Sequence, residues 1–234
     1  DLGDNVVALT ASDDSGNSAT CNATVTVIID NGENTLAGNI ATENNANLAN
    51  VEVIWTVNGQ AQPSFTTDET GDYELIAQDG DDVEIRPFKN TLPKNGLSTF
   101  DLVIIHQHVL NINLMPSPYQ RIAADANRDG VITTGDMSQI QALILNNLNS
   151  FPHNTSWRFA VANPVLQNPA ASAEVPDYDE SLIYNNVNMD FLTGDFVAIK
   201  IGDVSGNAMV NNFGETNVVE NRSNEQTILE LDNS

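Results

Sequence analysis

The apolar residues of this chain come in short runs, and that pattern limits the folds it can adopt. In residues 5–11, 19–29 and 35–87, apolar side chains alternate with polar ones. Asn, Asp, Gly and Thr crowd the segments between these runs, as in "SDDSGNS" and "DETGDY". Alternation with a period of two predicts β-strands, and these small polar residues predict the turns that join them. The sequence therefore predicts a mainly β chain built from several modules.

Two β regions follow one another. The first is a hairpin of strands at 5–11 and 19–29, which is too small to be stable alone. The second spans residues 35–87, with turn signals such as "NG" between its strands. Its expected strands are 36–42, 51–57, 64–67, 73–77 and 83–86. Further strands are expected at "SWRFAV" and "DFVAIKIGDV", near the C-terminal end.

Composition limits the partners and the cellular location. The 234 residues include 32 acidic and 8 basic side chains, a formal charge of −24. Nucleic acid is not an expected partner, because binding a polyanion requires clustered Lys and Arg. We expect no transmembrane segment, since no apolar run approaches the roughly 20 residues that a bilayer requires. The sequence has no initiator Met and no signal peptide, so we interpret it as a piece of a longer secreted or surface-anchored protein.

The hydrophobic period changes from two to a helical repeat after Leu97. The segment "DLVIIHQHVLNINL" and the segment "DMSQIQALILNNL" each place apolar residues on one helical face. The two segments match at a spacing of 35 residues, with Asp101 aligned to Asp136 and Ile105 aligned to Ile140. This internal match predicts a duplicated loop and helix.

The run "DANRDGVITTGD", residues 125–136, has the pattern of a calcium loop. Calcium takes six to eight oxygen ligands, and a 12-residue loop supplies them from positions 1, 3, 5, 7, 9 and 12. Gly130 stands at position 6, where the chain must turn with a positive φ. The alternative is a solvated turn of Asp, Asn and Gly, which four matched side chains make less probable. The expected ligands are Asp125, Asn127, Asp129, the carbonyl of Val131, Thr133 and Asp136.

A second ion site is less well supported. Counting back from Asp101, the segment "NTLPKNGLSTFD" offers Asn90 and Asn95 but no early acidic ligand, and its glycine is displaced by one position. The segment "GDVSGNAMVN" at 202–211 also partly matches a calcium loop. It has Ala208 in place of the glycine and no following helix, which favours a β-turn there.

Residues 88–148 resemble a type I dockerin, a small calcium module of two loop-helix halves. The resemblance rests on Asp rather than Glu at loop position 12 and on the lack of a clear amphipathic helix before the loop. Dockerins bind cohesins through polar pairs just before the last ligand. The equivalent pairs here are Thr99 with Phe100 and Thr134 with Gly135, so the resemblance does not transfer a partner specificity.

The β regions also resemble known modules. Residues 1–30 resemble the last strands of an Ig-like hyalin-repeat domain, and residues 35–87 resemble a carboxypeptidase regulatory-like, prealbumin-type β-sandwich. Two interpretations of Cys21 stay open: a buried small apolar residue, or, as the hyalin-repeat resemblance implies, a disulfide partner of an earlier strand. We expect the dockerin-like module with its β extension at 88–210, and a linker with the start of another domain at 211–234.

No pattern of residues indicates catalysis. His106 and His108 are two positions apart on a predicted helix, so they lie on nearly opposite faces and cannot share a metal. His153 is the remaining histidine, and Cys21 lies in a strand without a neighbouring base. The carboxylates show no spacing that selects a pair for acid-base chemistry. We therefore expect a protein that is not an enzyme.

These observations predict a structural role. We interpret the chain as a segment of a large bacterial adhesin or structural protein, like those of Bacteroidetes, in which Ca²⁺ stiffens a domain junction. Its partners would be neighbouring domains of the same chain or other copies. The alternative is a docking module that binds a cohesin-like domain and assembles extracellular complexes.

Overall fold

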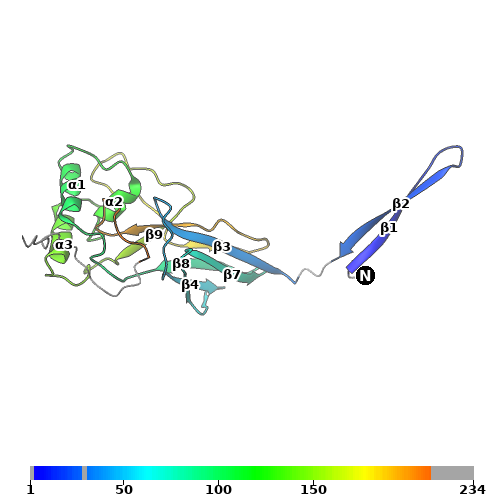
Figure 1. Ribbon diagram of the computed structural model, residues 1–234, viewed down its shortest axis with the longest axis horizontal. Coiled ribbons are helices and arrows are strands. Elements are labelled where there is room, and N and C mark those ends of the chain that lie inside the picture. The colour runs from blue at the N-terminus through cyan, green and yellow to red at the C-terminus, as the bar shows by residue number, and fades with distance from the viewer. Residues whose placement is uncertain (1–2, 28–30, 212–234) are drawn as a thin grey trace, which may run out of the picture.

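The computed structural model describes residues 3–27 and 31–211, which form a mainly β chain with several sheets (Figure 1). Its strands and helices follow the expected order, with strands first, helices next and strands again. The strands are β1 (Gly3–Ser12), β2 (Ser18–Val27), β3 (Glu33–Thr42), β4 (Glu52–Val57), β5 (Gln60–Ala61), β6 (Phe65–Thr66), β7 (Asp72–Gln78), β8 (Val83–Phe88), β9 (Trp157–Val161), β10 (Leu182–Tyr184) and β11 (Phe196–Lys200). The helices are α1 (Thr99–Val109), α2 (Pro118–Ala124) and α3 (Thr134–Ile144).

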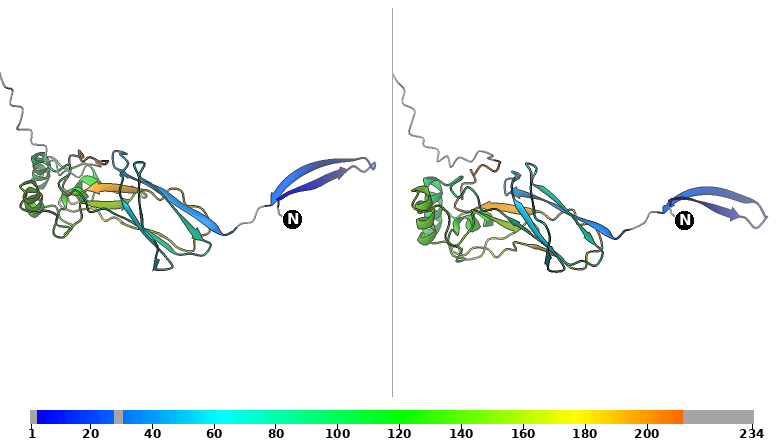
Figure 2. Two further views of the ribbon diagram at one scale, coloured as in Figure 1. Left: turned by 60° about the horizontal axis from the view of Figure 1, so that its bottom comes forward. Right: turned by 90° about the horizontal axis from the view of Figure 1, so that it is seen from below.

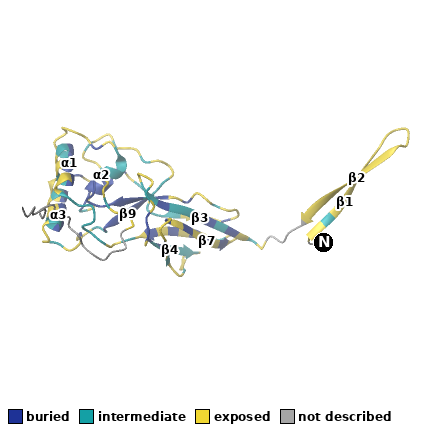
Figure 3. Cartoon of the chain, in the orientation of Figure 1, coloured by how far each residue is buried: buried dark blue, intermediate teal, exposed yellow. Residues whose placement is uncertain are grey.

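The expected N-terminal hairpin is present as the antiparallel pair of β1 and β2. Its register places Leu9 opposite Cys21 and Val7 opposite Ala23, so one face of the hairpin is apolar. None of its described side chains is buried, and Figure 3 shows the hairpin almost wholly in the exposed colour. Cys21 is a free, exposed thiol on this apolar face, so it is not the buried residue of the first interpretation.

Two sheets share one apolar core in the middle of the chain. One sheet has the strand order β10-β8-β4-β5, with β6 also paired to β4, and the other has the order β7-β3-β11-β9. Alternation places every second side chain of β7 and β8 inward, as at Leu75 and Ile85. The five strands expected between residues 36 and 86 are all present, and the hairpin strand β5 adds to them.

Strands from the C-terminal part of the chain complete both sheets. β11 pairs in parallel with β3 and in antiparallel with β9, while β10 pairs with β8. Trp157, Phe159 and Phe196 from these strands enter the same core as Leu36 and Ile85. The sheets therefore extend beyond the expected module of residues 35–87. The β extension expected at 149–210 belongs to them, and the helical segment is inserted between β8 and β9.

The helices lie together beyond one end of the sheets (Figure 2). Ile105 of α1 and Ile140 of α3 are fully buried in a second core, and Val109 and Ile144 pack at its edge. Ser98 caps the start of α1, and Thr133 caps the start of α3. Asp101 and Asp136 occupy the third position of their helices, where each side chain accepts from the backbone amide of the capping residue.

The described helices are all too short and too polar to cross a membrane. The final expected segment, with "TILELD" as the start of a following domain, lies outside the described residues, which end at 211.

Candidate metal centre

The predicted calcium loop connects two helices. α2 ends at Ala124, and Asp125 follows as its C-terminal cap. Thr133 caps α3, and Asp136 lies in the first turn of that helix. No amphipathic pattern predicts a helix before the loop, yet α2 supplies two turns there. Four consecutive residues of α2, from Arg121 to Ala124, are buried, so this short helix has no polar face to produce a recognisable period.

Backbone amides of the loop surround the two terminal carboxylates. Asp125 accepts hydrogen bonds from the amides of Asp129 (3.1 Å, on Oδ1) and Gly130 (3.0 Å, on Oδ2). Asp136 accepts from the amides of Asn127 (3.1 Å, on Oδ1) and Thr133 (2.8 Å, on Oδ2). The first and last predicted ligands are thus held by the same short loop, with their orientations fixed by its backbone.

The intermediate predicted ligands lie on the same turn. The side-chain Nδ2 of Asn127 donates to Oδ2 of Asp129 at 2.8 Å. The backbone amide of Val131 donates to Oδ1 of Asp129 at 3.0 Å, and the hydroxyl of Thr133 reaches Asp136 at 3.2 Å. Gly130 has a φ of +82°, the left-handed conformation that the sequence predicted for position 6.

The electrostatics of the loop call for a cation. Asp125 is 6% exposed and Asp136 is fully buried. Burial raises the pKa of both carboxyls; repulsion from Asp129 raises them further, and backbone hydrogen bonds oppose the shift. Among the described residues, no Lys, Arg or His lies within ion-pair distance of either carboxylate. Arg128, which lies in the loop, pairs with Glu180 at 3.3 Å.

The donor set fits a hard cation such as Ca²⁺. Within the described ranges, no three His, Cys, Asp or Glu side chains form a metal-binding group. The oxygens of this loop are mixed instead, from carboxylates, an amide, a hydroxyl and a main-chain carbonyl. Such mixed oxygen sets are what calcium loops of this length use. Asp125, Asn127, Asp129, Val131, Thr133 and Asp136 are the residues that would hold the ion.

The loop is fastened to a segment far along the chain. The amide of Ile132 donates to the carbonyl of Ala173 at 2.8 Å, and Val175 donates to the carbonyl of Gly130 at 3.1 Å. The side chain of Asn154 donates to the backbone carbonyl of Asp125 at 3.0 Å. The conformation of residues 125–136 is therefore coupled to the long connection between β9 and β10.

Each of the residues suggested for a second ion has a different hydrogen-bond partner. The side-chain oxygen of Asn90 accepts from the amide and the hydroxyl of Ser156. Asn95 pairs with the backbone of Met209, at 2.8 and 3.1 Å. Asp101 is fully buried and instead accepts from the amide of Ser205 at 2.9 Å. Of the three residues, only Asp101 is a buried carboxylate.

Residues 203–208 form a tight turn around the buried carboxylate of Asp203. Asp203 is 6% exposed, and its carboxylate accepts from backbone amides across the turn, including Asn207 at 3.2 Å and Ala208 at 2.7 Å. The sequence favours a β-turn for this segment, because Ala208 stands in place of the glycine and no helix follows.

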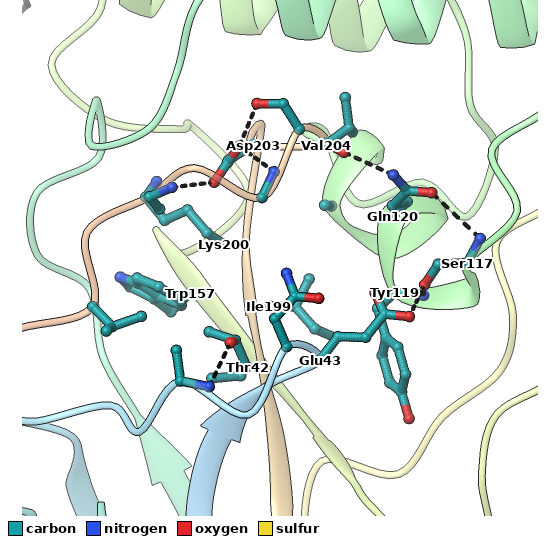
Figure 4. A pocket seen from close by; sticks show the side chains of 18 of the residues that line it. Thr42, Glu43, Ser117, Tyr119, Gln120, Trp157, Ile199, Lys200, Asp203 and Val204 are labelled. Atoms are coloured by element: carbon teal, nitrogen blue, oxygen red, sulfur yellow. Dashed lines mark hydrogen bonds between the residues drawn. The ribbon is translucent and has the colours of Figure 1, made fainter. Parts of the chain in front are cut away.

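A cavity of about 380 Å³ lies beside Asp203, between the sheets and the helices (Figure 4). Glu43, Tyr119, Trp157 and Lys200 are among its lining residues. Glu43 accepts from the hydroxyl of Ser117 at 2.6 Å. Burial lowers the pKa of Lys200 to about 7, while the nearby carboxylates of Asp203 and Asp101 oppose the shift.

Comparison with known proteins leaves the chain without an assigned family. No protein-family model matches it, and no curated protein is similar enough to count as a match.

Proposed function

We propose that this chain is a non-enzymatic, calcium-stabilised structural segment of a large secreted or surface-anchored bacterial protein. Ca²⁺ bound by residues 125–136 would fix the helical insert to the sheets and stiffen that junction. The observation that carries the proposal is the pair of buried carboxylates, Asp125 and Asp136, which face one loop without a cationic partner. Buried charges of this kind are normally paired or bound to a metal.

The packing around the insert explains why an ion there would stiffen the junction. The helical core includes Ala160 of β9 and Ile199 of β11, so the insert and one sheet share buried side chains. Gly202, just after β11, donates to the carbonyl of Ala123 in α2 at 2.8 Å. An ion that orders the loop after α2 therefore also orders the contact between α2 and the sheet.

The dockerin-like, Ig-like and prealbumin-like resemblances support the same role. Modules of these kinds serve as spacers and connectors in extracellular proteins, where millimolar calcium is encountered. Extracellular calcium sites can have dissociation constants of roughly 10⁻⁴ to 10⁻³ M. At a hundredfold excess over such a constant, the bound ion adds about 2.7 kcal/mol to the free energy of unfolding.

Thermal unfolding of the whole chain, with calcium and with excess chelator, tests the proposal. We expect calcium to raise the temperature of the unfolding transition that involves the helices. We also expect it to slow hydrogen exchange at the amides of α3 and of residues 173–175. The variant Asp125→Asn should lose most of this response, because it keeps the shape of the side chain but removes its charge. Asp68→Asn is the matched control, since Asp68 caps an exposed turn by accepting from the amide and hydroxyl of Thr70. Equal responses of parent and Asp125→Asn would refute the proposal.

A second candidate function, docking of a cohesin-like domain, is favoured by one surface. Phe100 and Val103 of α1 are 60% and 49% exposed, and Leu110 and Leu145, which cap the ends of α1 and α3, are exposed as well. Apolar side chains gathered on two contacting helices are typical of a protein-protein interface. Binding of cohesin-like domains to the parent, with loss of binding in Phe100→Ser, would support docking. Ile183→Ser, on the exposed side of β10, is the control.

A further inference from the structure

We propose that residues 169–180, in the connection between β9 and β10, form a strap that holds the calcium loop of residues 125–136 closed, so that the ion leaves only when the strap lifts. Glu180 is the side chain that fastens the strap to the loop, through Arg128. The strap acts on the same ion and therefore rests on the proposed function. It adds to that function the part of the chain that controls release of the ion.

The backbone of the strap pairs with the backbone of the loop. The amide of Ile132, in the loop, donates to the carbonyl of Ala173 at 2.8 Å. The amide of Val175, in the strap, donates to the carbonyl of Gly130 at 3.1 Å. These two bonds enclose an antiparallel bridge at Val131. Because Val131 is the expected ligand that binds through its carbonyl, the strap fixes the backbone on both sides of that ligand.

Charged side chains make a second contact between the strap and the loop. Arg128, in the loop, donates to one carboxylate oxygen of Glu180 at 3.3 Å. Arg158 of β9 pairs with the other oxygen of the same carboxylate. The side chain of Arg158 is only 8% exposed, whereas that of Arg128 is 55% exposed. Glu180 therefore joins the loop to the sheet, and its pair with Arg158 is the better shielded of the two.

The strap is fastened by hydrogen bonds and ion pairs more than by burial. Pro176 is buried, and the other strap residues, all of them described, are partly or fully exposed. Arg121 of α2 donates to the carbonyl of Pro169 at 3.3 Å, and His108 of α1 lies 2.6 Å from the carbonyl of Ser172. Segments with few buried apolar contacts open locally at a lower free-energy cost than the core does. The strap can therefore lift while both cores stay folded.

A cavity of about 380 Å³ lies between the loop, the strap and β9. Asp125 and Asp129 of the loop line it, together with Tyr178 and Glu180 of the strap and Arg158 of β9. Two of the expected ligands therefore face a space that can hold water beside the ion. Because this space already gives access to the ligands, the step that limits release is the separation of the ligands. That separation requires the loop backbone to leave the strap.

A closed strap favours the loop conformation that binds the ion. It raises the population of the closed loop before the ion arrives, so weakening the strap lowers the apparent affinity for calcium. It also lengthens the lifetime of the closed loop once the ion is bound. Weakening the contacts of Glu180 should therefore act mainly by speeding release of the ion.

Stopped-flow mixing of the calcium-loaded whole chain with an excess of a fluorescent chelator measures the release rate. We expect Glu180→Gln to release calcium about tenfold faster than the parent, because it breaks the shielded pair with Arg158 as well as the pair with Arg128. Arg128→Gln should release it about two- to fivefold faster, because it breaks only the exposed pair. Arg86→Gln, at an exposed position of β8, is the matched control and should release calcium at the rate of the parent.

Hydrogen exchange of the calcium-loaded chain, followed residue by residue by NMR, shows where each variant opens. We expect both Glu180→Gln and Arg128→Gln to exchange the amides of Ile132 and Val175 faster than the parent, since these amides join the loop to the strap. The amides of β11 should exchange at the rate of the parent, since the sheet stays folded when the strap lifts.

The outcomes separate the strap from the proposed function. Release at the parent rate in both variants, from a parent that binds calcium, overturns the strap and keeps the proposed function. Faster release without faster exchange at the two joining amides, or with equally faster exchange in β11, also overturns the strap. A parent that binds no calcium overturns both. If Glu180→Gln does not fold, Arg128→Gln decides by the same two measurements.

Discussion

His108 makes the helical insert sensitive to acid. The ring is 1% exposed and joins two segments of the insert: Nδ1 accepts from the amide of Met115 at 2.9 Å, and Nε2 lies 2.6 Å from the carbonyl of Ser172. These contacts require the neutral ring with its proton on Nε2. A second proton on Nδ1 would face the amide of Met115, so protonation must break that hydrogen bond. Ser172 precedes Ala173, whose carbonyl accepts from the amide of Ile132, and the effect therefore reaches the loop of residues 125–136.

The sign of the pH dependence follows from the direction of the pKa shift. Burial lowers the pKa of His108 below its ordinary value of 6.5, and the charge of Arg121 lowers it further, while the bond to Ser172 opposes the shift. Below pH 6.5 the unfolded chain binds more protons than the folded chain, so acid favours unfolding. The stabilisation by the neutral ring is fully present above pH 6.5 and is lost as the pH falls through the folded pKa.

The substitution His108→Asn isolates this effect. Asparagine can still accept from Met115 but cannot reach Ser172, so the buried carbonyl of Ser172 loses its partner. We expect a loss of about 1–3 kcal/mol in the free energy of unfolding at pH 8. Between pH 6.5 and 5 the difference in free energy of unfolding between parent and variant should shrink, because protonation of His108 destabilises only the parent.

Urea unfolding at several pH values, in saturating calcium, measures the difference. His106→Asn is the matched control, since His106 is exposed on the same helix and should leave the pH profile of the parent unchanged. Parallel loss of stability in the parent and His108→Asn from pH 8 to 5 would show that the ring is not the acid-sensitive group.

Two further predictions concern packing and loop geometry. Ile140→Ala removes a fully buried side chain between the helices and should lower the free energy of urea unfolding by about 2–5 kcal/mol. Leu145→Ala, at a 58% exposed position, should change it by no more than about 0.5 kcal/mol. Similar losses in the two variants would mean that the helix core is misassigned. Gly96→Ala should destabilise the chain more than Gly130→Ala, because both glycines have φ near +80° but only a Cβ at Gly96 meets backbone and carboxylate atoms; equal melting temperatures of the two variants would contradict this.

Local patterns were enough to predict the first strands and the turn within residues 125–136. The strands between β3 and β8 follow an alternation that is visible within a few residues, because successive side chains of a strand point to opposite faces. The loop at 125–136 places all its expected ligands within 12 residues, so its geometry depends on nearby backbone conformation. Its turn at Gly130 was readable from residue type, whereas the cap at Thr133 was not predicted.

Local patterns failed where burial removed the polar face of an element. The helix α2 carries buried residues in sequence, including the charged Arg121, whose Nη1 donates to the carbonyls of Pro169 and Ala171. Periodicity cannot identify a helix that is enclosed on most sides. The three-residue strand β10 was missed for a related reason, because it is defined mainly by its pairing with β8.

The tertiary structure alone decided which distant segments meet. The sequence indicated strands near 157–161 and 196–200 but not that they complete the sheet of β3, since pairing depends on the path of the whole chain. The same holds for the buried carboxylate of Asp101, which accepts from the backbone amide of Ser205. By itself, each of these two segments is indistinguishable from a helix cap or a turn. Only the fold, by placing β11 beside β3 and the exit of the insert beside its entrance, brings the two segments together.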